Sequence, residues 1–90
     1  MSAVLIVRVN VTRYDAWRTA FDANAHWRRG HGVISEEVYC SPEDMTVVVV
    51  LLDFDALEGA QLFAADPELA EAMKASGAFG TPRIIIAEVA

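Results

Sequence analysis

The sequence predicts an α+β domain of the ferredoxin-like type, in which two helical segments pack on one face of a four-stranded antiparallel sheet. Two observations lead to this fold class. Segments rich in β-branched residues alternate with segments of helical spacing in the order β-α-β-β-α-β. The chain has only 90 residues, and 54% of them are apolar or aromatic, which predicts a single folded domain over residues 1–90.

The first half of the chain predicts a strand, a helix and a second strand. Residues 3–11 (AVLIVRVNV) are dominated by β-branched side chains, which favour a strand. Thr12 is expected to cap the helix that follows, and Trp17 lies on the apolar stripe of that helix. Gly30 ends the helix, and residues 33–40 predict the second strand.

The second half predicts a strand, a broken helix and a last strand. Residues 46–54 form the most hydrophobic strand of the chain. Asp55 opens a D-x-x-E capping box, which predicts the start of a helix. The pair Asp66-Pro67 restarts this helix, because Asp caps helices well and Pro is favoured at the first helical position. Residues 83–89 then supply the fourth strand.

The third strand is apolar on both of its faces, which predicts that both faces of the sheet are covered. Antiparallel sheets with one face in water instead alternate between apolar and polar residues. Because the helices cover only one face, we expect a second copy of the chain on the other, giving a homodimer whose two sheets form an α+β barrel. We place Val50 on this shared face, so that Val50→Asp is expected to break the dimer.

Charge and composition argue against several functional classes. The chain has 13 acidic and 7 basic residues, a net charge of −6, so no nucleic-acid partner is expected. No apolar run approaches the ~20 residues of a membrane span, and no basic region precedes the first apolar run, so we expect a cytoplasmic protein without a membrane partner. Cys40 is the only cysteine, and no set of metal ligands is evident, so no metal is expected.

The chain resembles the dimeric α+β-barrel superfamily, and within it the antibiotic biosynthesis monooxygenases. The resemblance covers nearly the whole chain and rests on the element order, on Gly32 at the start of the second strand and on three segments: VVVVLLDF at 47–54, AADPEL at 64–69 and GTPR at 80–83. It implies a cofactor-independent monooxygenase of secondary metabolism. Such an enzyme oxidises a small aromatic or polyketide-like molecule with dioxygen and needs no flavin, haem or metal. The preference for Arg over Lys and the high Ala content are typical of a GC-rich bacterial genome.

The resemblance leaves the catalytic residues open. Family members that hydroxylate aromatic polyketides carry an Asn and a Trp near the end of the third strand, and a Tyr and an Arg on the helical region after it. The matching positions here are Val50, Phe54, Ala60 and Ala70, so only an aromatic ring is retained. Haem-degrading relatives need a Trp in that strand and a His on the next helix. This chain has no His after residue 31, so haem degradation is not expected.

Five residues are the candidates for contact with the substrate: Arg8, Asn10, Trp17, Leu52 and Phe54. The two polar residues are placed on the dimer-facing side of the sheet, where they could donate hydrogen bonds to a phenolate or enolate oxygen. The alternatives are an ion pair across the interface with Glu36 or Glu88, or simple exposure at the end of the strand. The three apolar residues are expected to form walls of a pocket, with a plain core role as their alternative.

The two histidines are the remaining candidates for chemistry. His26 and His31 are the only side chains with an ordinary pKa near neutrality, so either could act as a general base, and simple solvent exposure is the alternative. Two further functions stay open beside the oxygenase. One is a polyketide cyclase or isomerase of the same superfamily, which would need such a base. The other is a non-catalytic binding protein or a structural dimer.

Overall fold

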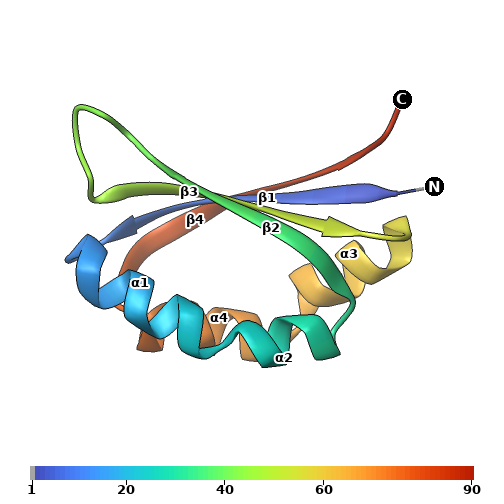
Figure 1. Cartoon of the computed structure of the whole chain (residues 1–90), viewed down its shortest axis with the longest axis horizontal. Coiled ribbons are helices and arrows are strands. Elements are labelled where there is room, and N and C mark those ends of the chain that lie inside the picture. The colour runs from blue at the N-terminus through green and yellow to red at the C-terminus, as the bar shows by residue number, and fades with distance from the viewer. Residues whose placement is uncertain (1) are drawn as a thin grey trace.

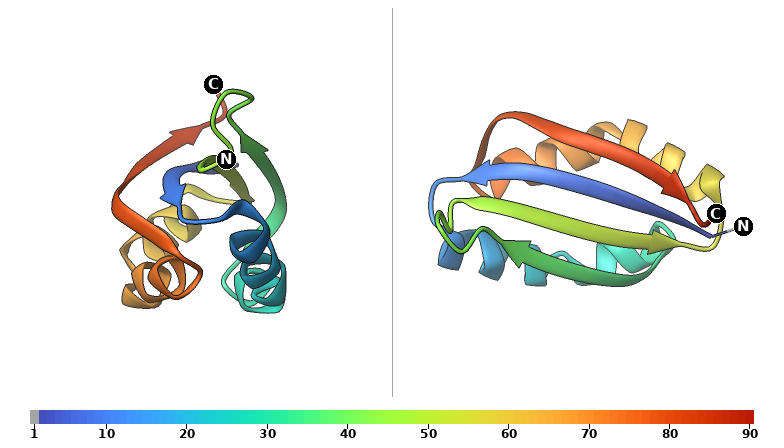
Figure 2. Two further views of the ribbon diagram at one scale, coloured as in Figure 1. Left: turned by 90° about the vertical axis from the view of Figure 1, so that its left-hand side faces the viewer. Right: turned by 90° about the horizontal axis from the view of Figure 1, so that it is seen from above.

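A computed structural model describes residues 2–90 of the chain and has eight elements. In chain order they are β1 (Ala3–Val11), α1 (Tyr14–Ala23), α2 (Ala25–Gly30), β2 (Val33–Cys40), β3 (Val47–Phe54), α3 (Leu57–Ala65), α4 (Pro67–Ala75) and β4 (Ala78–Glu88) (Figure 1). The strands form one antiparallel sheet in the order β2-β3-β1-β4. Both helix pairs lie on the same side of this sheet (Figure 2). The predicted ferredoxin-like fold is therefore confirmed.

The predicted break in the second helical segment is confirmed. Asp66 caps α4, since its Oδ1 accepts a hydrogen bond from the backbone N–H of Glu68 at 2.9 Å. Pro67 occupies the first turn, where a helix makes no use of the missing N–H. The chain thus changes direction between α3 and α4 at the dipeptide that the sequence singles out.

The other helix boundaries differ from the prediction. The first helical segment is also divided, at Asn24, which ends α1 and precedes α2. Thr12 does not cap α1, because its hydroxyl donates instead to the carbonyl oxygen of Gly77 at 3.1 Å and ties the end of β1 to the start of β4. Asp55 does not cap α3 either, because the N-cap residue is Ala56, which makes no side-chain cap bond.

The last strand is longer than predicted. β4 begins at Ala78 rather than at Arg83, and its pairing with β1 shifts register between Arg8 and Asn10. Gly80 lies in this irregular part with a φ of 71°, a conformation that glycine adopts at low cost. Gly80 and Pro82 therefore lie in an irregular, bulged part of the strand.

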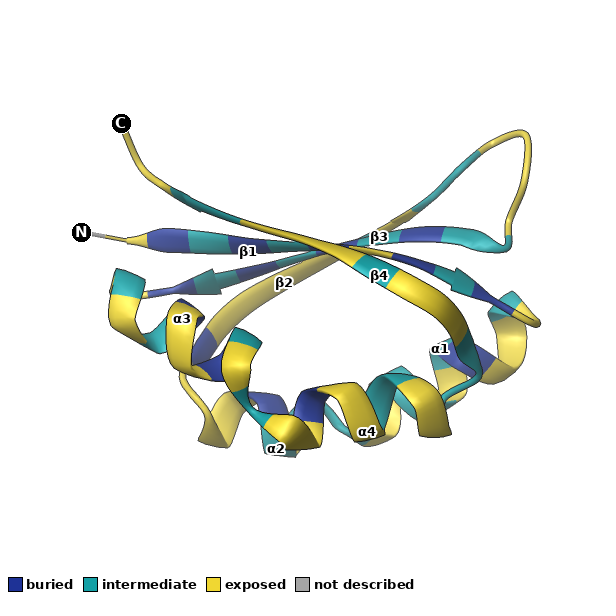
Figure 3. Cartoon of the chain, turned by 180° about the vertical axis from the view of Figure 1, so that it is seen from behind, coloured by how far each residue is buried: buried dark blue, intermediate teal, exposed yellow. Residues whose placement is uncertain are grey.

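One face of the sheet is buried beneath the helices (Figure 3). Alternate residues of β1 and β3 form it, from Ala3 to Val11 and from Val48 to Phe54, and each of their side chains is at most 5% exposed. Val50 belongs to this face at 4% exposure, because the register pairs it with the buried Val7. Its predicted place on a dimer-facing surface is therefore wrong.

The opposite face of the sheet carries no helix, and we call it the open face (Figure 2). Ile6 lies at its middle, with Leu51 beside it on β3 and Ile85 on β4. Arg8 and Arg83 are cross-strand neighbours and are both exposed.

None of the helices formed by residues 2–90 is long and apolar enough to cross a lipid bilayer.

A tyrosine on the open face gives a test of local electrostatics. The hydroxyl of Tyr39 donates to Oε2 of Glu37 at 2.6 Å, and this bond raises the pKa of Tyr39. Glu37→Gln is expected to lower the pKa of Tyr39 back toward its ordinary value, because a neutral amide favours the protonated phenol less. Ultraviolet titration of the phenolate measures the change, and Tyr14→Phe isolates the signal. An unchanged titration would contradict the assigned bond.

Candidate ligand cavity between the sheet and the helices

A cavity of about 60 Å³ lies between the buried face of the sheet and the helices. Its floor consists of strand side chains from β1 and β3, among them Val7 and Leu52. Its walls come from both helix pairs and include Trp17, Phe63 and Met73. A space of this volume admits only a few waters, so a ring system must displace part of the wall to enter.

Four aromatic rings, those of Trp17, Phe21, Trp27 and Phe63, lie in the wall. Trp17 and Phe21, four residues apart on α1, stack with their ring centroids 4.9 Å apart and their planes 23° apart. Trp27 of α2 lies against Phe63 of α3, with centroids 5.1 Å apart. Flat rings at these separations leave faces and edges against which another aromatic ring can pack favourably. The wall therefore suits a planar, apolar ligand.

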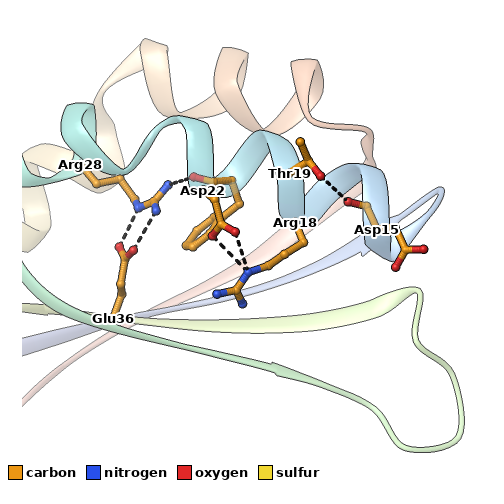
Figure 4. A network of polar contacts seen from close by, with 7 residues as sticks. Asp15, Arg18, Thr19, Asp22, Arg28 and Glu36 are labelled. Carbon is orange, nitrogen blue, oxygen red and sulfur yellow. Dashed lines mark hydrogen bonds and ion pairs between the residues drawn. The ribbon is translucent and has the colours of Figure 1, made fainter.

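One end of the cavity is polar and is formed by Arg28. This side chain is only 4% exposed, and its Nε and Nη2 donate to the two carboxylate oxygens of Glu36 at 2.7 and 2.8 Å (Figure 4). Its Nη1 donates to the backbone oxygen of Phe21 at 2.7 Å, and the guanidinium lies 3.5 Å from the centroid of the Phe21 ring. A buried charge needs such partners, and a carboxylate that accepts two bonds fixes the guanidinium in one orientation.

An irregularity in β2 places the Glu36 side chain on the buried face, beside Arg28. The pairing of β2 with β3 shifts register between Val33 and Ser35, so that Glu36 pairs with Leu52 of the buried face. A shift of one residue turns every later side chain to the other side of a sheet. Without this bulge Glu36 would point away from the helices, and Arg28 would have no carboxylate partner.

Two smaller polar groups complete the lining. Asn24 borders the cavity and is half-buried, and its carboxamide, which is not fully buried, makes no hydrogen bond to another side chain within 2–90. The hydroxyl of Ser76 donates to the backbone oxygen of Met73 at 2.8 Å. Among the lining residues that the structure describes, none is a histidine or an acid, so the cavity offers hydrogen-bond donors and no obvious proton acceptor with a suitable pKa.

Contacts between α2 and α4 hold the two helix pairs together at one end. The indole Nε1 of Trp27 donates to Glu68 at 3.1 Å, and Nε2 of His31 lies 3.5 Å from a carboxylate oxygen of Asp66. Nδ1 of His31 is 2.9 Å from the backbone oxygen of Trp27. His31 thus lies between the helix pairs rather than in the cavity lining, and His26 is exposed.

The structure divides the five predicted contact residues between the two faces of the sheet. Trp17 and Leu52 line the cavity. Phe54 is 1% exposed and lies behind the lining, with its ring centroid 5.8 Å from that of Phe63. Arg8 and Asn10 lie on the open face, where the register pairs them with residues 49 and 47 of β3. No single site of this chain contains all five.

The residues that sequence reasoning missed are Asn24 and Arg28, together with Trp27. A usable signal exists for the first two, because both fall on the same helical stripe as Trp17. A charged residue on an apolar stripe requires a buried partner. Glu36, expected as a partner of Arg8 across a dimer, is instead that partner of Arg28.

A second hollow adjoins the cavity, and we call it the outer groove. It has a volume of about 420 Å³ and lies between α4 and the irregular start of β4, where Lys74 and Phe79 border it. Val9 and Met73 line both the outer groove and the cavity. Met73 is unbranched and flexible, so the wall between the two spaces is adaptable.

Known proteins resemble this chain in structure and not in sequence. No sequence-family model matches it, and no curated protein matches it in sequence. SnoaB, a cofactor-independent oxygenase from Streptomyces nogalater, superimposes with a TM-score of 0.78 at 13% identity, covering 99% of this chain and 93% of that one. A candidate antibiotic biosynthesis monooxygenase from Bordetella bronchiseptica has a TM-score of 0.81 at 13% identity, covering 99% and 97%. The chain has the antibiotic biosynthesis monooxygenase fold.

A third protein with the antibiotic biosynthesis monooxygenase fold was solved with a ligand. The ActVA-Orf6 monooxygenase of Streptomyces coelicolor, in complex with Nanaomycin D, superimposes with a TM-score of 0.70 at 22% identity, covering 99% of this chain and 88% of that one. The fold that the sequence resemblance implies is thus confirmed.

Family members with the antibiotic biosynthesis monooxygenase fold that hydroxylate aromatic polyketides carry Asn, Trp, Tyr and Arg at four positions where this chain has apolar residues. Val50 lines the cavity, whereas Phe54 and Ala60 are buried at 1% and 0% exposure. Ala70 borders the outer groove. The two larger polar side chains of the cavity, Asn24 and Arg28, come instead from the first helix pair, and the smaller Ser76 follows α4.

Proposed function

We propose that the chain is a cofactor-independent oxygenase that binds a small aromatic or polyketide-like molecule in the cavity. The observation that carries the proposal is the combination of an apolar space walled by aromatic rings with one fixed guanidinium, that of Arg28. Two structural neighbours, a cofactor-independent oxygenase and a monooxygenase solved with a bound ligand, support the reaction class.

The chemistry can be written for an anthrone as a model substrate. Its enol loses a proton, and the resulting anion gives one electron to dioxygen. The carbon radical and superoxide combine to form a carbon–oxygen bond, and protonation gives a hydroperoxide. Loss of water from this hydroperoxide leaves a carbonyl, so the methylene group loses two hydrogens, one oxygen atom stays on carbon and the other leaves as water. The substrate supplies all the electrons, and the protein supplies a dry space and a hydrogen bond to the anion.

The lining of the cavity favours this reaction over the alternative cyclase. A cyclase needs a positioned general base, whereas the described lining residues include no histidine and no acid. An oxidisable phenol or anthrone carries its own acidic proton, which solvent can remove before or during entry. The oxygenase reaction therefore does not require a general base among the described lining residues.

Oxygen consumption tests the proposal. Protein freed of metal and flavin is given a panel of anthrones and hydroquinones, and uptake above the rate of autoxidation is expected. Ala72→Phe, which fills the cavity from α4, is expected to lower uptake at least ~10-fold, while Ala75→Phe on the exposed side of the same helix leaves it unchanged. No uptake with any substrate would refute the oxygenase, and product formed without oxygen would identify a cyclase.

We also propose that a second copy of the chain covers the open face. The row formed by Ile6, Leu51 and Ile85 gives an apolar centre. Acidic side chains lie on the β2 and β3 half of this face, whereas Arg8 and Arg83 lie on the β1 and β4 half. A two-fold axis parallel to the strands would place the acidic half of one copy over the basic half of the other, which is a self-complementary arrangement.

Ile6→Lys is expected to weaken this dimer roughly 100-fold, because it buries an unpaired charge at the centre of the interface. Sedimentation at micromolar concentration measures the change. Leu62→Lys is the matched control, since Leu62 is 73% exposed on α3 and away from the open face. A parent protein that sediments as a monomer, or an Ile6→Lys variant that stays dimeric, would contradict the assignment.

A further inference from the structure

We infer that Asn24 and Arg28 together hold the oxygen of a planar hydroxylated aromatic ligand in its ionised, phenolate form. The inference rests on the proposed function, because it names the class of molecule that the cavity takes and the end of the cavity at which its oxygen lies. The ligand oxygen is then bound by residues of the first helix pair, α1 and α2. The third strand and the helices after it, which are far away in the sequence, do not supply this contact.

Arg28 has hydrogen-bonding capacity that its protein partners do not use. Three bonds engage it, two to Glu36 and one to the backbone oxygen of Phe21. A guanidinium carries more N–H donors than these three bonds use, so donors remain for a ligand. The guanidinium borders the cavity and is fixed by its partners, which means that a ligand meets an already oriented donor.

Asn24 lies beside Arg28 despite the break between α1 and α2. The backbone N–H of Arg28 donates to the carbonyl oxygen of Asn24 at 3.1 Å, which preserves the helical spacing of four residues across the break. Side chains with this spacing share one face of a helix. The Asn24 carboxamide, which has no partner among residues 2–90, is therefore available to the same ligand.

The surroundings of these two residues define the ligand. Close to Arg28, the stacked rings of Trp17 and Phe21 present an aromatic surface. The remainder of the lining is almost wholly apolar, and the carboxylate at this end, that of Glu36, is engaged by two hydrogen bonds from Arg28 and does not line the cavity. A molecule that fits has one oxygen-bearing edge toward Asn24 and Arg28 and a planar aromatic ring against the apolar remainder of the lining. Donors fixed beside a phenol favour its charged form and lower its pKa.

The test uses 4-nitrophenol, whose phenolate is coloured, and nitrobenzene, which has the same ring without the hydroxyl. The parent is expected to bind the phenolate roughly 10-fold more tightly than the phenol, so that binding lowers the pKa of the probe by about one unit. The paired substitution Arg28→Met with Glu36→Gln, which avoids leaving a lone buried charge, should abolish this shift. Asn24→Leu should reduce it. Arg29→Met removes an equal charge from the exposed side of α2 and should preserve it.

The two probes together distinguish a failure of the role of Asn24 and Arg28 from a failure of the cavity as a ligand site. Nitrobenzene binding, followed by quenching of tryptophan fluorescence, should be detectable in the parent and unchanged in Arg29→Met, whose side chain does not line the cavity. If nitrobenzene binds but the pKa of bound 4-nitrophenol is unshifted, or is shifted equally in the double variant, the role of Asn24 and Arg28 is refuted while the cavity stands as a ligand site. If neither probe binds, the cavity itself is refuted as a site, and the inference fails with it.

Discussion

Val50→Asp is expected to unfold the protein at 25 °C. Val50 is 4% exposed, lies between the sheet and the helices, and has only apolar neighbours on the strands that flank it. An unpaired carboxylate at this place costs several kcal/mol, comparable with the roughly 5–13 kcal/mol that stabilises a domain of this length. Far-UV circular dichroism and urea titration measure the loss.

The neighbouring residue gives the control. Val49 points to the open face and pairs with Arg8, so Val49→Asp places its carboxylate away from the helices and beside a positive charge. This variant is expected to stay folded and to lose at most about 1 kcal/mol. If Val49→Asp unfolded and Val50→Asp did not, the assignment of the two faces would have to be reversed.

Glu36→Ala is expected to lower the free energy of unfolding by about 3 kcal/mol, because it leaves Arg28 buried without its carboxylate. The Glu36 side chain is itself 30% exposed, so the loss comes mainly from the arginine that stays behind. Thermal and urea unfolding measure it. The double variant Arg28→Met with Glu36→Gln should regain most of the loss, since neither residue then carries a charge.

Glu37→Ala serves as the comparison for the same strand. Glu37 points to the open face, and its one hydrogen bond, to Tyr39, is exposed. Its removal should change the free energy of unfolding by no more than about 0.5 kcal/mol. Equal effects at positions 36 and 37 would mean that the register shift in β2 is misplaced.

The sequence predicts most of the fold because the strands carry a strong pattern. In β1 and β3 the alternation separates two sets of residues correctly, and the element order leads directly to the sheet topology. The pattern cannot state which set lies under the helices when both sets are apolar. That choice depends on tertiary packing, and it is the reason that Val50 is placed on the wrong face.

The candidate site is less predictable than the fold, since two irregularities create it. A bulge in β2 turns Glu36 toward the helices, and the break at Asn24 lets the first helical segment bend while Arg28 keeps its spacing. Neither has a clear sequence signal, because the residues around Ser35 and Asn24 are compatible with regular structure. The sequence feature that does indicate this site is Arg28, a charged residue on an apolar helical stripe.

The wall that the cavity shares with the outer groove affects how quickly its size can change. Val9 is held in a central strand, whereas Met73 projects from α4 on a side chain with several rotatable bonds. Rotamer changes of side chains are faster than movements of whole helices, which take microseconds or longer. A wall that yields through Met73 can therefore change the size of the cavity without any movement of α4.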